Sequence, residues 1–220
     1  MSVHQNFAPI SGSLYVEAGA KPVYARGVVK RLLDLAIAVP ALIVLSPLLL
    51  LLAILIRTGS QGPAIFRQTR LGLQGAPFQI FKFRTMTVLE NGPVVQQAVK
   101  NDARVTKVGR WMRRLSLDEL PQLLNVIKGE MSLIGPRPHA LAHDRHYGRA
   151  IDGYDLRQTV KPGITGWAQV HGHRGATMTI SEMRERLAYD VWYARNASFT
   201  LDLKIVARTF REVLGQRNAY

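Results

Sequence analysis

The chain has 220 residues, enough for one good-sized domain with its own hydrophobic core. It contains no cysteine, which excludes a disulfide framework and a thiolate metal site. Lys and Arg number 29 against 15 Asp and Glu, a net charge of +14 that favours nucleic acid, anionic lipid or phosphorylated substrates as partners. Because no helix-turn-helix, zinc or aromatic RNA-binding signature is present, nucleic acid is disfavoured.

Residues 1 to about 22 show no clear hydrophobic period, and we expect residues 1–29 to form a flexible N-terminal segment. An apolar run then covers Leu35–Ile56, 22 residues without a charge. As a helix it would reach about 33 Å, just enough to cross a hydrocarbon core of about 30 Å. The run begins after 34 residues and no small-residue cleavage site follows it, so it is not a secretory signal. It therefore favours membrane lipid as a partner.

Two features of this run favour a re-entrant helix over a straight span. Ser46-Pro47 lies near its middle, where proline kinks or breaks a helix, and the Ser46 hydroxyl is the nearest partner for backbone groups freed there. Basic residues flank both ends, with Lys30 and Arg31 before the run and Arg57 after it, so both flanks prefer the cytoplasm. We expect residues 30–57 to form a re-entrant helix broken at Ser46-Pro47. A Pro-kinked span remains the alternative.

The rest of the chain, residues 58–220, reads as a single unit that is mostly helical with a small β-hairpin. Alternating apolar residues predict short strands at 64–66 and 78–83, joined by a turn. A polar loop is expected over 87–103. Helical spacing predicts helices from 120 to a stop at Gly129, then over 139–149, 179–195 and 201–214.

Two adjacent carboxylates, Asp118 and Glu119, admit two interpretations. Ser116 and Glu119 fit the S-x-x-E capping box, and acidic residues are favoured at a helix N-terminus, which would make the pair structural. Arginines precede the pair, however, and a helix N-terminus near arginines is also an anion site. A carboxylate placed there could attack a phosphorus atom while its neighbour holds Mg²⁺.

Further basic motifs point to phosphate chemistry. The stretch "KFRTM" offers Lys82 and Arg84, and "GPRP" holds Arg137 between two prolines. Arginine binds phosphate with two parallel hydrogen bonds, which lysine cannot do. Each cation taken singly is better explained as an ordinary solvated surface residue.

Three histidines, His139, His143 and His146, fall on one face of a predicted helix. This spacing could hold a metal ion. Because there is no H-E-x-x-H pattern and no thiolate, zinc is disfavoured.

Several long motifs in order resemble the bacterial sugar transferases, specifically the small form of the monotopic phosphoglycosyl transferases. They are the apolar run with its central Ser-Pro, "FRQTRLGLQGAPFQIFKFRTM", "DARVTKVGRWMRRLSLDELPQLLNVIKGEMSLIGPRP", "VKPGITGWAQV" and "YDVWYARNASFTLDLKI". The resemblance runs from about Lys30 to the C-terminal helix. It implies re-entry at Ser46-Pro47 into one leaflet of the bacterial inner membrane, with a catalytic domain of amphipathic helices on the cytoplasmic face.

The resemblance also implies roles for individual residues. The catalytic pair of the family falls on Asp118 and Glu119, with Mg²⁺ as cofactor. Its phosphate-contacting arginine falls on Arg113, and its motif lysine and Pro-Arg-Pro arginine fall on Lys82 and Arg137. A further functional aspartate falls on Asp190.

The activity implied is transfer of a hexose 1-phosphate from a UDP-sugar to undecaprenyl phosphate with release of UMP, the first membrane step of exopolysaccharide or other glycoconjugate assembly. Asp118 would attack the phosphorus that bears the sugar, forming an aspartyl-phosphosugar, in a two-step exchange. The motifs favour glucose or galactose. An N-acetylated amino-sugar donor, direct glycosyl transfer with release of UDP, and a non-catalytic membrane scaffold remain alternatives. A homodimer is compatible with the lipid-facing and C-terminal helices.

Overall fold

A computed structural model describes residues 23–87 and 102–214 of the chain. The predictions for residues 1–22, and most of the polar loop predicted over 87–103, lie outside the described residues. Within them the chain is mostly helical with a small antiparallel hairpin, as the sequence predicts.

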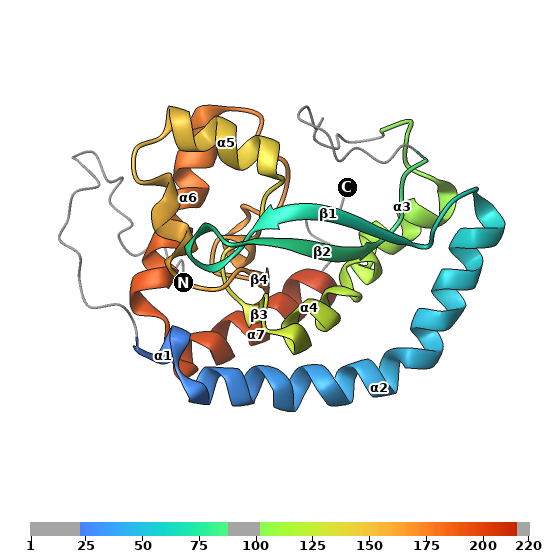
Figure 1. Ribbon diagram of the computed structural model, residues 1–220, viewed down its shortest axis with the longest axis horizontal. Helices are drawn as coiled ribbons and strands as arrows, with labels where there is room; N and C mark the ends of the chain where they lie inside the picture. Colours follow the sequence, from blue (N-terminus) through green and yellow to red (C-terminus); the bar gives the residue numbers. More distant parts are fainter. Residues whose placement is uncertain (1–22, 88–101, 215–220) are drawn as a thin grey trace.

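A short helix α1 (Val23–Arg26) leads into the long helix α2 (Val28–Gly59). The predicted break at Ser46-Pro47 is wrong, because α2 continues through both residues as one helix that bends along its course (Figure 1). Pro47 has no N–H for the carbonyl of Ile43, but the Ser46 hydroxyl donates to that carbonyl at 2.7 Å. The freed acceptor is therefore satisfied, and the helix bends rather than ends.

Most of α2 is apolar surface. It is the one helix in the described residues that is long and apolar enough to cross a membrane by length and composition, and only 11% of its most apolar window is buried. Ile43, Val44 and Leu50 are more than 60% exposed. The buried positions follow one side of the helix, including Ala38 and Leu52, so α2 contacts the domain on one face and exposes its other sides.

The hairpin consists of β1 (Ile65–Leu71) and β2 (Pro77–Phe83), which pair antiparallel with Ile65 opposite Phe83. This confirms the predicted strands, although β1 extends beyond 64–66. The turn between them contains the short 3₁₀-helix η1 (Leu73–Gly75). On its far side β2 is bound to α4 through Asn125, which is fully buried, accepts from Phe81 N at 2.9 Å and donates to the Gln79 carbonyl at 2.7 Å.

Several short helices, the longer helices α6 and α7, and two very short strands make up the remainder of the described chain. Glycine ends α4 as predicted, since Gly129 adopts a left-handed φ of 84°. The strands β3 and β4 pair in parallel, which the sequence did not predict. In chain order the elements are α3 (Lys107–Arg114), η2 (Leu117–Glu119), α4 (Gln122–Lys128), β3 (Ser132–Ile134), α5 (Leu141–Ala150), η3 (Tyr154–Thr159), β4 (Gly163–Thr165), η4 (Gln169–His171), α6 (Ile180–Asn196) and α7 (Phe199–Leu214).

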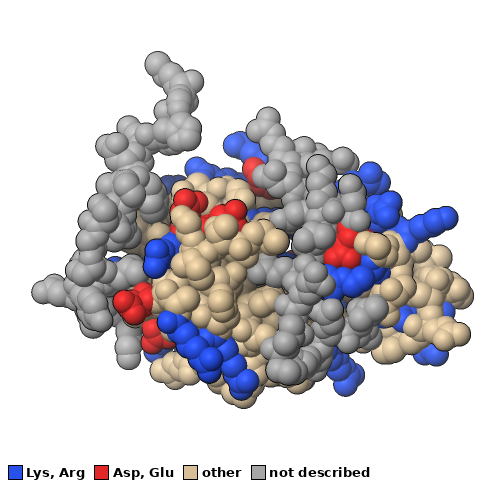
Figure 2. All heavy atoms as spheres, turned by 90° about the horizontal axis from the view of Figure 1, so that it is seen from above, with Lys and Arg blue, Asp and Glu red and all other residues tan. Residues whose placement is uncertain are grey.

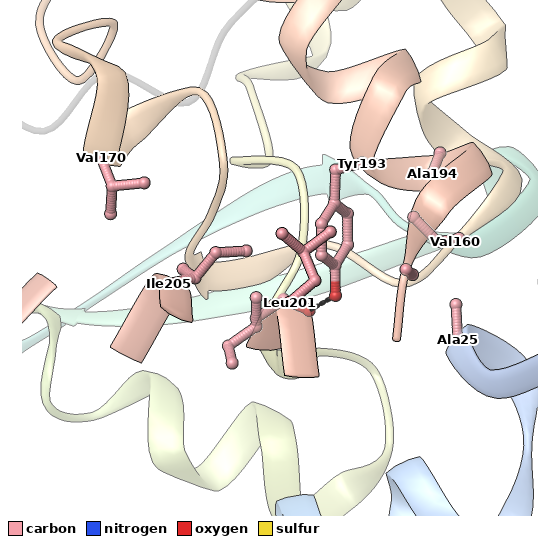
Figure 3. Packing of buried hydrophobic residues seen from close by; sticks show 9 residues of the cluster. Ala25, Val160, Val170, Tyr193, Ala194, Leu201 and Ile205 are labelled. Atoms are coloured by element: carbon pink, nitrogen blue, oxygen red, sulfur yellow. Dashed lines mark hydrogen bonds between the residues drawn. The ribbon is translucent and has the colours of Figure 1, made fainter. Parts of the chain in front are cut away.

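One hydrophobic cluster joins α6, α7 and the short strands around Tyr193, and Ala25 of α1 also belongs to it (Figure 3). The Tyr193 hydroxyl donates to Asp202 of α7 at 2.8 Å. Asp202 also accepts the ammonium group of Lys30 at 2.7 Å, and both side chains are almost fully buried. Asp34, one turn further along α2, accepts the Ser132 hydroxyl at 3.0 Å. The start of α2 is therefore bonded to α7 and β3.

Candidate active site

The carboxylates Asp118 and Glu119 lie in η2, just before α4, and both are buried. Ser116, which precedes η2, has a left-handed backbone with φ of 59° and makes no capping hydrogen bond. The capping-box interpretation is therefore wrong. The Ser116 hydroxyl instead accepts a hydrogen bond from Arg174, and the Glu119 carboxylate faces two cations.

Glu119 binds Lys82 and Arg137. Lys82 Nζ lies 3.0 Å from Glu119 Oε1, and the Arg137 guanidinium donates to both oxygens, at 2.6 Å to Oε1 and 3.2 Å to Oε2. Burial raises the pKa of Glu119, but the charges of Arg137 and Lys82 outweigh burial and hold this pKa well below its ordinary value. Glu119 is therefore ionised, and it fixes the positions of both cations.

Asp118 has a different environment. Within the described residues its carboxylate makes no hydrogen bond and no ion pair. Burial and the neighbouring charge of Glu119 raise the pKa of Asp118, and the charges of Lys82, Arg113 and Arg137 only partly oppose this. A buried carboxylate without a direct partner, surrounded by cations, is available to react with an electrophile or to bind a cation.

Three of the predicted residues thus approach Asp118 from separate elements. Lys82 lies near the end of β2, and Arg113 lies in the last turn of α3, half-buried, where its charge lowers the pKa of Asp118. Arg137 follows β3 between its two prolines. Burial also lowers the pKa of the Lys82 ammonium group, an effect that the charge of Glu119 opposes. The structure therefore brings together residues that are far apart in the sequence.

Arg84 does not belong to this group, and its predicted role in phosphate binding is corrected. Its guanidinium is buried and donates to the backbone carbonyls of Ser60 at 2.8 Å, Gly62 at 3.2 Å and Gln61. A Cβ atom on Gly62 would lie 2.6 Å from Arg84 Nη1, so glycine permits this close approach. Arg84 thus fixes the connection between α2 and β1.

Asp190 acts on the site through other residues. It accepts the Arg157 guanidinium at 3.0 Å from Nε and 2.8 Å from Nη2, and both side chains are buried. Arg157 Nη2 also donates to the backbone carbonyl of Arg137 at 2.6 Å. Asp190 therefore positions Arg137, which in turn binds Glu119, and sequence reasoning missed the intermediate Arg157.

A buried histidine links this network to a neighbouring loop. His139 Nδ1 lies 2.8 Å from the Tyr154 hydroxyl, and Nε2 lies 3.3 Å from Arg186. Burial and the surrounding arginines lower the pKa of His139 well below its ordinary value, so this imidazole is neutral. Arg186 also donates to the carbonyl of Gly175, in the loop that carries Arg174.

Arg174 is the second residue that sequence reasoning missed. Its Nη2 donates to the Ser116 hydroxyl, and its charge contributes to the lowered pKa of Glu119. It lies in the motif "HGHRGAT", but nothing in the sequence indicates that this loop lies near a carboxylate pair that is more than 50 residues earlier in the chain.

The excess of basic residues also extends over the surface. Figure 2 shows the face opposite the longer arm of α2, where Lys and Arg side chains are spread over the described surface and Asp and Glu form smaller patches. This distribution favours approach of anionic molecules to the domain.

A divalent cation fits Asp118 better than Glu119. The Asp118 carboxylate has no direct partner among the described residues, whereas both Glu119 oxygens already accept from cations. No group of three or more His, Asp or Glu in the described part of the chain could hold a metal ion. Mg²⁺ typically binds one or two carboxylates and completes its shell with water and substrate phosphates, so one carboxylate here is sufficient.

Comparison with known proteins gives consistent matches. A family model described as bacterial sugar transferase matches residues 25–216. The UDP-glucose:undecaprenyl-phosphate glucose-1-phosphate transferase of Caulobacter vibrioides is 53% identical over 202 residues, which cover 92% of this chain and 76% of that protein. The protein of the same name from Escherichia coli (strain K12) is 50% identical over 191 residues, covering 87% of this chain and 41% of that protein.

Similarity extends to a relative with another sugar in its name. The UDP-N-acetylgalactosamine-undecaprenyl-phosphate N-acetylgalactosaminephosphotransferase of Aeromonas hydrophila is 43% identical over 194 residues, covering 88% of this chain and 45% of that protein. The chain spans about two fifths of the length of the Escherichia coli and Klebsiella pneumoniae relatives, 41% and 42%.

Proposed function

Because the chain belongs to the bacterial sugar transferase family, we propose that it transfers a hexose 1-phosphate from a UDP-sugar to undecaprenyl phosphate and releases UMP. Glucose is the favoured sugar, since it is named in relatives that are 50 to 53% identical. The product would be the first lipid-linked intermediate in the assembly of an exopolysaccharide or another glycoconjugate.

The observation that carries this proposal is the unequal carboxylate pair. Asp118 is buried without a direct partner, while Glu119 is bound by Lys82 and Arg137. A nucleophile that must approach a diphosphate needs nearby cations to offset the repulsion between negative charges. Arg113 and the two cations at Glu119 supply that charge.

The reaction divides into two displacements at one phosphorus atom. In the first, an Asp118 carboxylate oxygen attacks the phosphorus that bears the sugar, and the bond to the UMP oxygen breaks. The resulting acyl phosphate carries the sugar. In the second, an oxygen of undecaprenyl phosphate attacks the same phosphorus, the bond to Asp118 breaks, and a lipid diphosphate sugar is released. Glu119 holds Lys82 and Arg137 in place through both steps.

Mg²⁺ would be held by Asp118 and by phosphate oxygens of the donor, where it would supply further neutralising charge. This assignment narrows the sequence prediction, in which both Asp118 and Glu119 bind the metal ion.

We place the protein in one leaflet of the bacterial inner membrane, with its domain on the cytoplasmic face. Support comes from α2, which bends along its course (Figure 1) and packs on the same domain near both of its ends. Leu52 and Ile56 pack against Phe83, and Lys30 binds Asp202. A helix that crossed the bilayer would carry one of these ends away from the domain.

Nucleotide release tests the proposal. The purified chain, in nanodiscs with Mg²⁺ and undecaprenyl phosphate, is incubated with UDP-glucose, UDP-galactose and UDP-N-acetylhexosamines. We expect release of UMP with UDP-glucose. Release of UDP would show direct glycosyl transfer, preference for an acetamido sugar would change the donor, and no release with any donor would favour a non-catalytic scaffold.

A further inference from the structure

The loop that carries Arg174 is fixed at several points. On one side, His171 Nδ1 lies 2.7 Å from the Trp167 carbonyl and its Nε2 lies 2.6 Å from Arg208. On the other side, the Tyr147 hydroxyl donates to the Thr177 carbonyl at 2.8 Å. Because both sides of the loop are attached to the domain, the position of Arg174 is set by the fold.

Arg174 is directed at the carboxylate pair. Its Nη2 donates to Ser116, two residues before Asp118, and its charge acts on Glu119. A guanidinium has five N–H donors, and in the described part of the chain Arg174 donates only to the Ser116 hydroxyl. The hydroxyl is a neutral acceptor and forms a weaker bond with a guanidinium than a phosphate oxygen does.

The charges around the pair match a diphosphate. Four cations lie near the two carboxylates, and two of these cations, Lys82 and Arg137, are bound by Glu119. Among the described residues the other two, Arg113 and Arg174, form no ion pair with a carboxylate. The charge of Arg113 acts on Asp118, while Arg174 bonds to Ser116 and its charge acts on Glu119. The diphosphate of a nucleotide sugar carries one negative charge on each of its phosphates.

We propose that Arg174 binds the diphosphate of the UDP-sugar donor, as a second arginine beside Arg113. On binding, a phosphate oxygen replaces the Ser116 hydroxyl as the acceptor for Arg174. This inference rests on the proposed function, because it assigns a further substrate contact to the same site.

Binding of UDP without turnover tests this role directly. Calorimetry with Mg²⁺ present would compare wild type with Arg174→Ala, Arg174→Lys, Ser116→Ala and Arg184→Ala, the last an exposed arginine on α6. We expect Arg174→Ala to weaken UDP binding and to raise the KM for the donor by roughly tenfold to a hundredfold, the effect of losing one charge-assisted hydrogen bond. Arg174→Lys keeps the charge but not the paired N–H donors, so its affinity for UDP should lie between those of wild type and Arg174→Ala. Ser116→Ala and Arg184→Ala should match wild type.

The Ser116→Ala variant separates substrate binding from a purely structural contact. If it weakens UDP binding as much as Arg174→Ala does, Arg174 serves only to hold Ser116 and the inference is wrong. Unchanged UDP binding in Arg174→Ala, with an unchanged melting temperature, would also overturn it. Failure of wild type to release UMP would count against the proposed function instead, since UDP binding is measured independently of turnover.

Discussion

Asp118 and Glu119 are adjacent in the chain, yet their surroundings give them opposite electrostatic properties. Glu119 is stabilised as an anion by two directly bonded cations, and its pKa falls. Asp118 has cations near it but none bonded to it, and its pKa rises because burial dominates. The protein thus keeps Asp118, the proposed nucleophile, in an environment that disfavours its charged form, while Glu119 holds Lys82 and Arg137 in place.

The first prediction concerns Asp118→Asn. A carboxyl group whose pKa is raised by folding destabilises the folded state at neutral pH, so the neutral amide should raise the melting temperature while UMP release is lost. The rise should be a few degrees, since roughly 1 kcal/mol corresponds to about 2–4 °C in a domain of this size. Thermal melting and the nucleotide assay measure the two effects. The exposed Asp152→Asn is the control, and a lower melting temperature in Asp118→Asn would contradict the argument.

His139 makes stability depend on pH. The pKa of His139 is lowered in the folded protein. Below the ordinary histidine pKa of about 6.5, the unfolded chain therefore binds a proton at this residue more readily than the folded protein does. The stabilisation from neutral His139 is therefore present above about pH 6.5 and is lost as the pH falls below it. Burial also lowers the pKa values of His171 and His173, so a test must change His139 alone.

We expect the melting temperature of wild type to fall more between pH 7.5 and pH 5.5 than that of His139→Gln. His146→Gln, which alters an exposed histidine of α5, should retain the wild-type dependence. Identical slopes in wild type and His139→Gln would mean that the buried imidazole does not contribute to this loss.

Individual residues could be predicted from sequence only where a motif names them. Lys82 and Arg137 were named from their basic motifs and Arg113 through the family resemblance, and the structure places all three near Asp118. Arg84 was assigned to phosphate because it lies in the basic stretch "KFRTM", but the backbone path around Gly62 brings together the carbonyl groups that it binds. Arg174 was missed because its proximity to Ser116 arises only from tertiary folding.

Among the described elements, α2 is the one that is long and apolar enough to cross a membrane by length and composition. Pro40 and Pro47 both lie inside this bent helix, and the Ser46 hydroxyl donates to the Ile43 carbonyl that Pro47 leaves without an N–H donor. A proline in the sequence predicts a disrupted helix but does not distinguish a bend from a break. The outcome depends on whether the carbonyl that loses its N–H partner finds another donor.

Single cysteines would test the proposed re-entry of α2. Because the chain has no cysteine, Val23→Cys before α2 and Arg149→Cys on α5 each give one label, and both positions are exposed. We expect neither variant to react with a membrane-impermeant maleimide in intact spheroplasts, and both to react after permeabilisation. Reaction of Val23→Cys in intact spheroplasts would indicate a straight span and refute re-entry.

Other elements differ in how well their sequence reveals them. The hairpin was predictable because apolar and polar residues alternate along β2 and a glycine-containing turn follows β1. The parallel pair of β3 and β4 was not, because each strand has three residues and the two are distant in the chain. Such short strands carry no period, and their pairing depends on tertiary contacts.

At the scale of the whole molecule, the bond between Lys30 and Asp202 joins the membrane helix to the C-terminal helix. Lys30→Met would leave a buried carboxylate without its cation, a change that typically costs about 3–5 kcal/mol. We therefore expect a large fall in melting temperature in detergent, whereas Lys204→Met, at an exposed position of α7, should have little effect. A small change in Lys30→Met would show that neighbouring groups such as Tyr24 compensate for the lost ion pair.

In the proposed re-entrant arrangement, the contacts of α2 with the domain near both of its ends would hold the carboxylate pair at a fixed distance from the apolar helix. A transmembrane helix must tilt or deform its surroundings when the hydrocarbon thickness changes. A helix that enters one leaflet and returns has no such mismatch, because it contacts only one surface of the bilayer and its depth is measured from that surface. UMP release should therefore be nearly the same in vesicles of shorter and longer acyl chains, and the acceptor phosphate would meet the enzyme at a constant height in membranes of different composition.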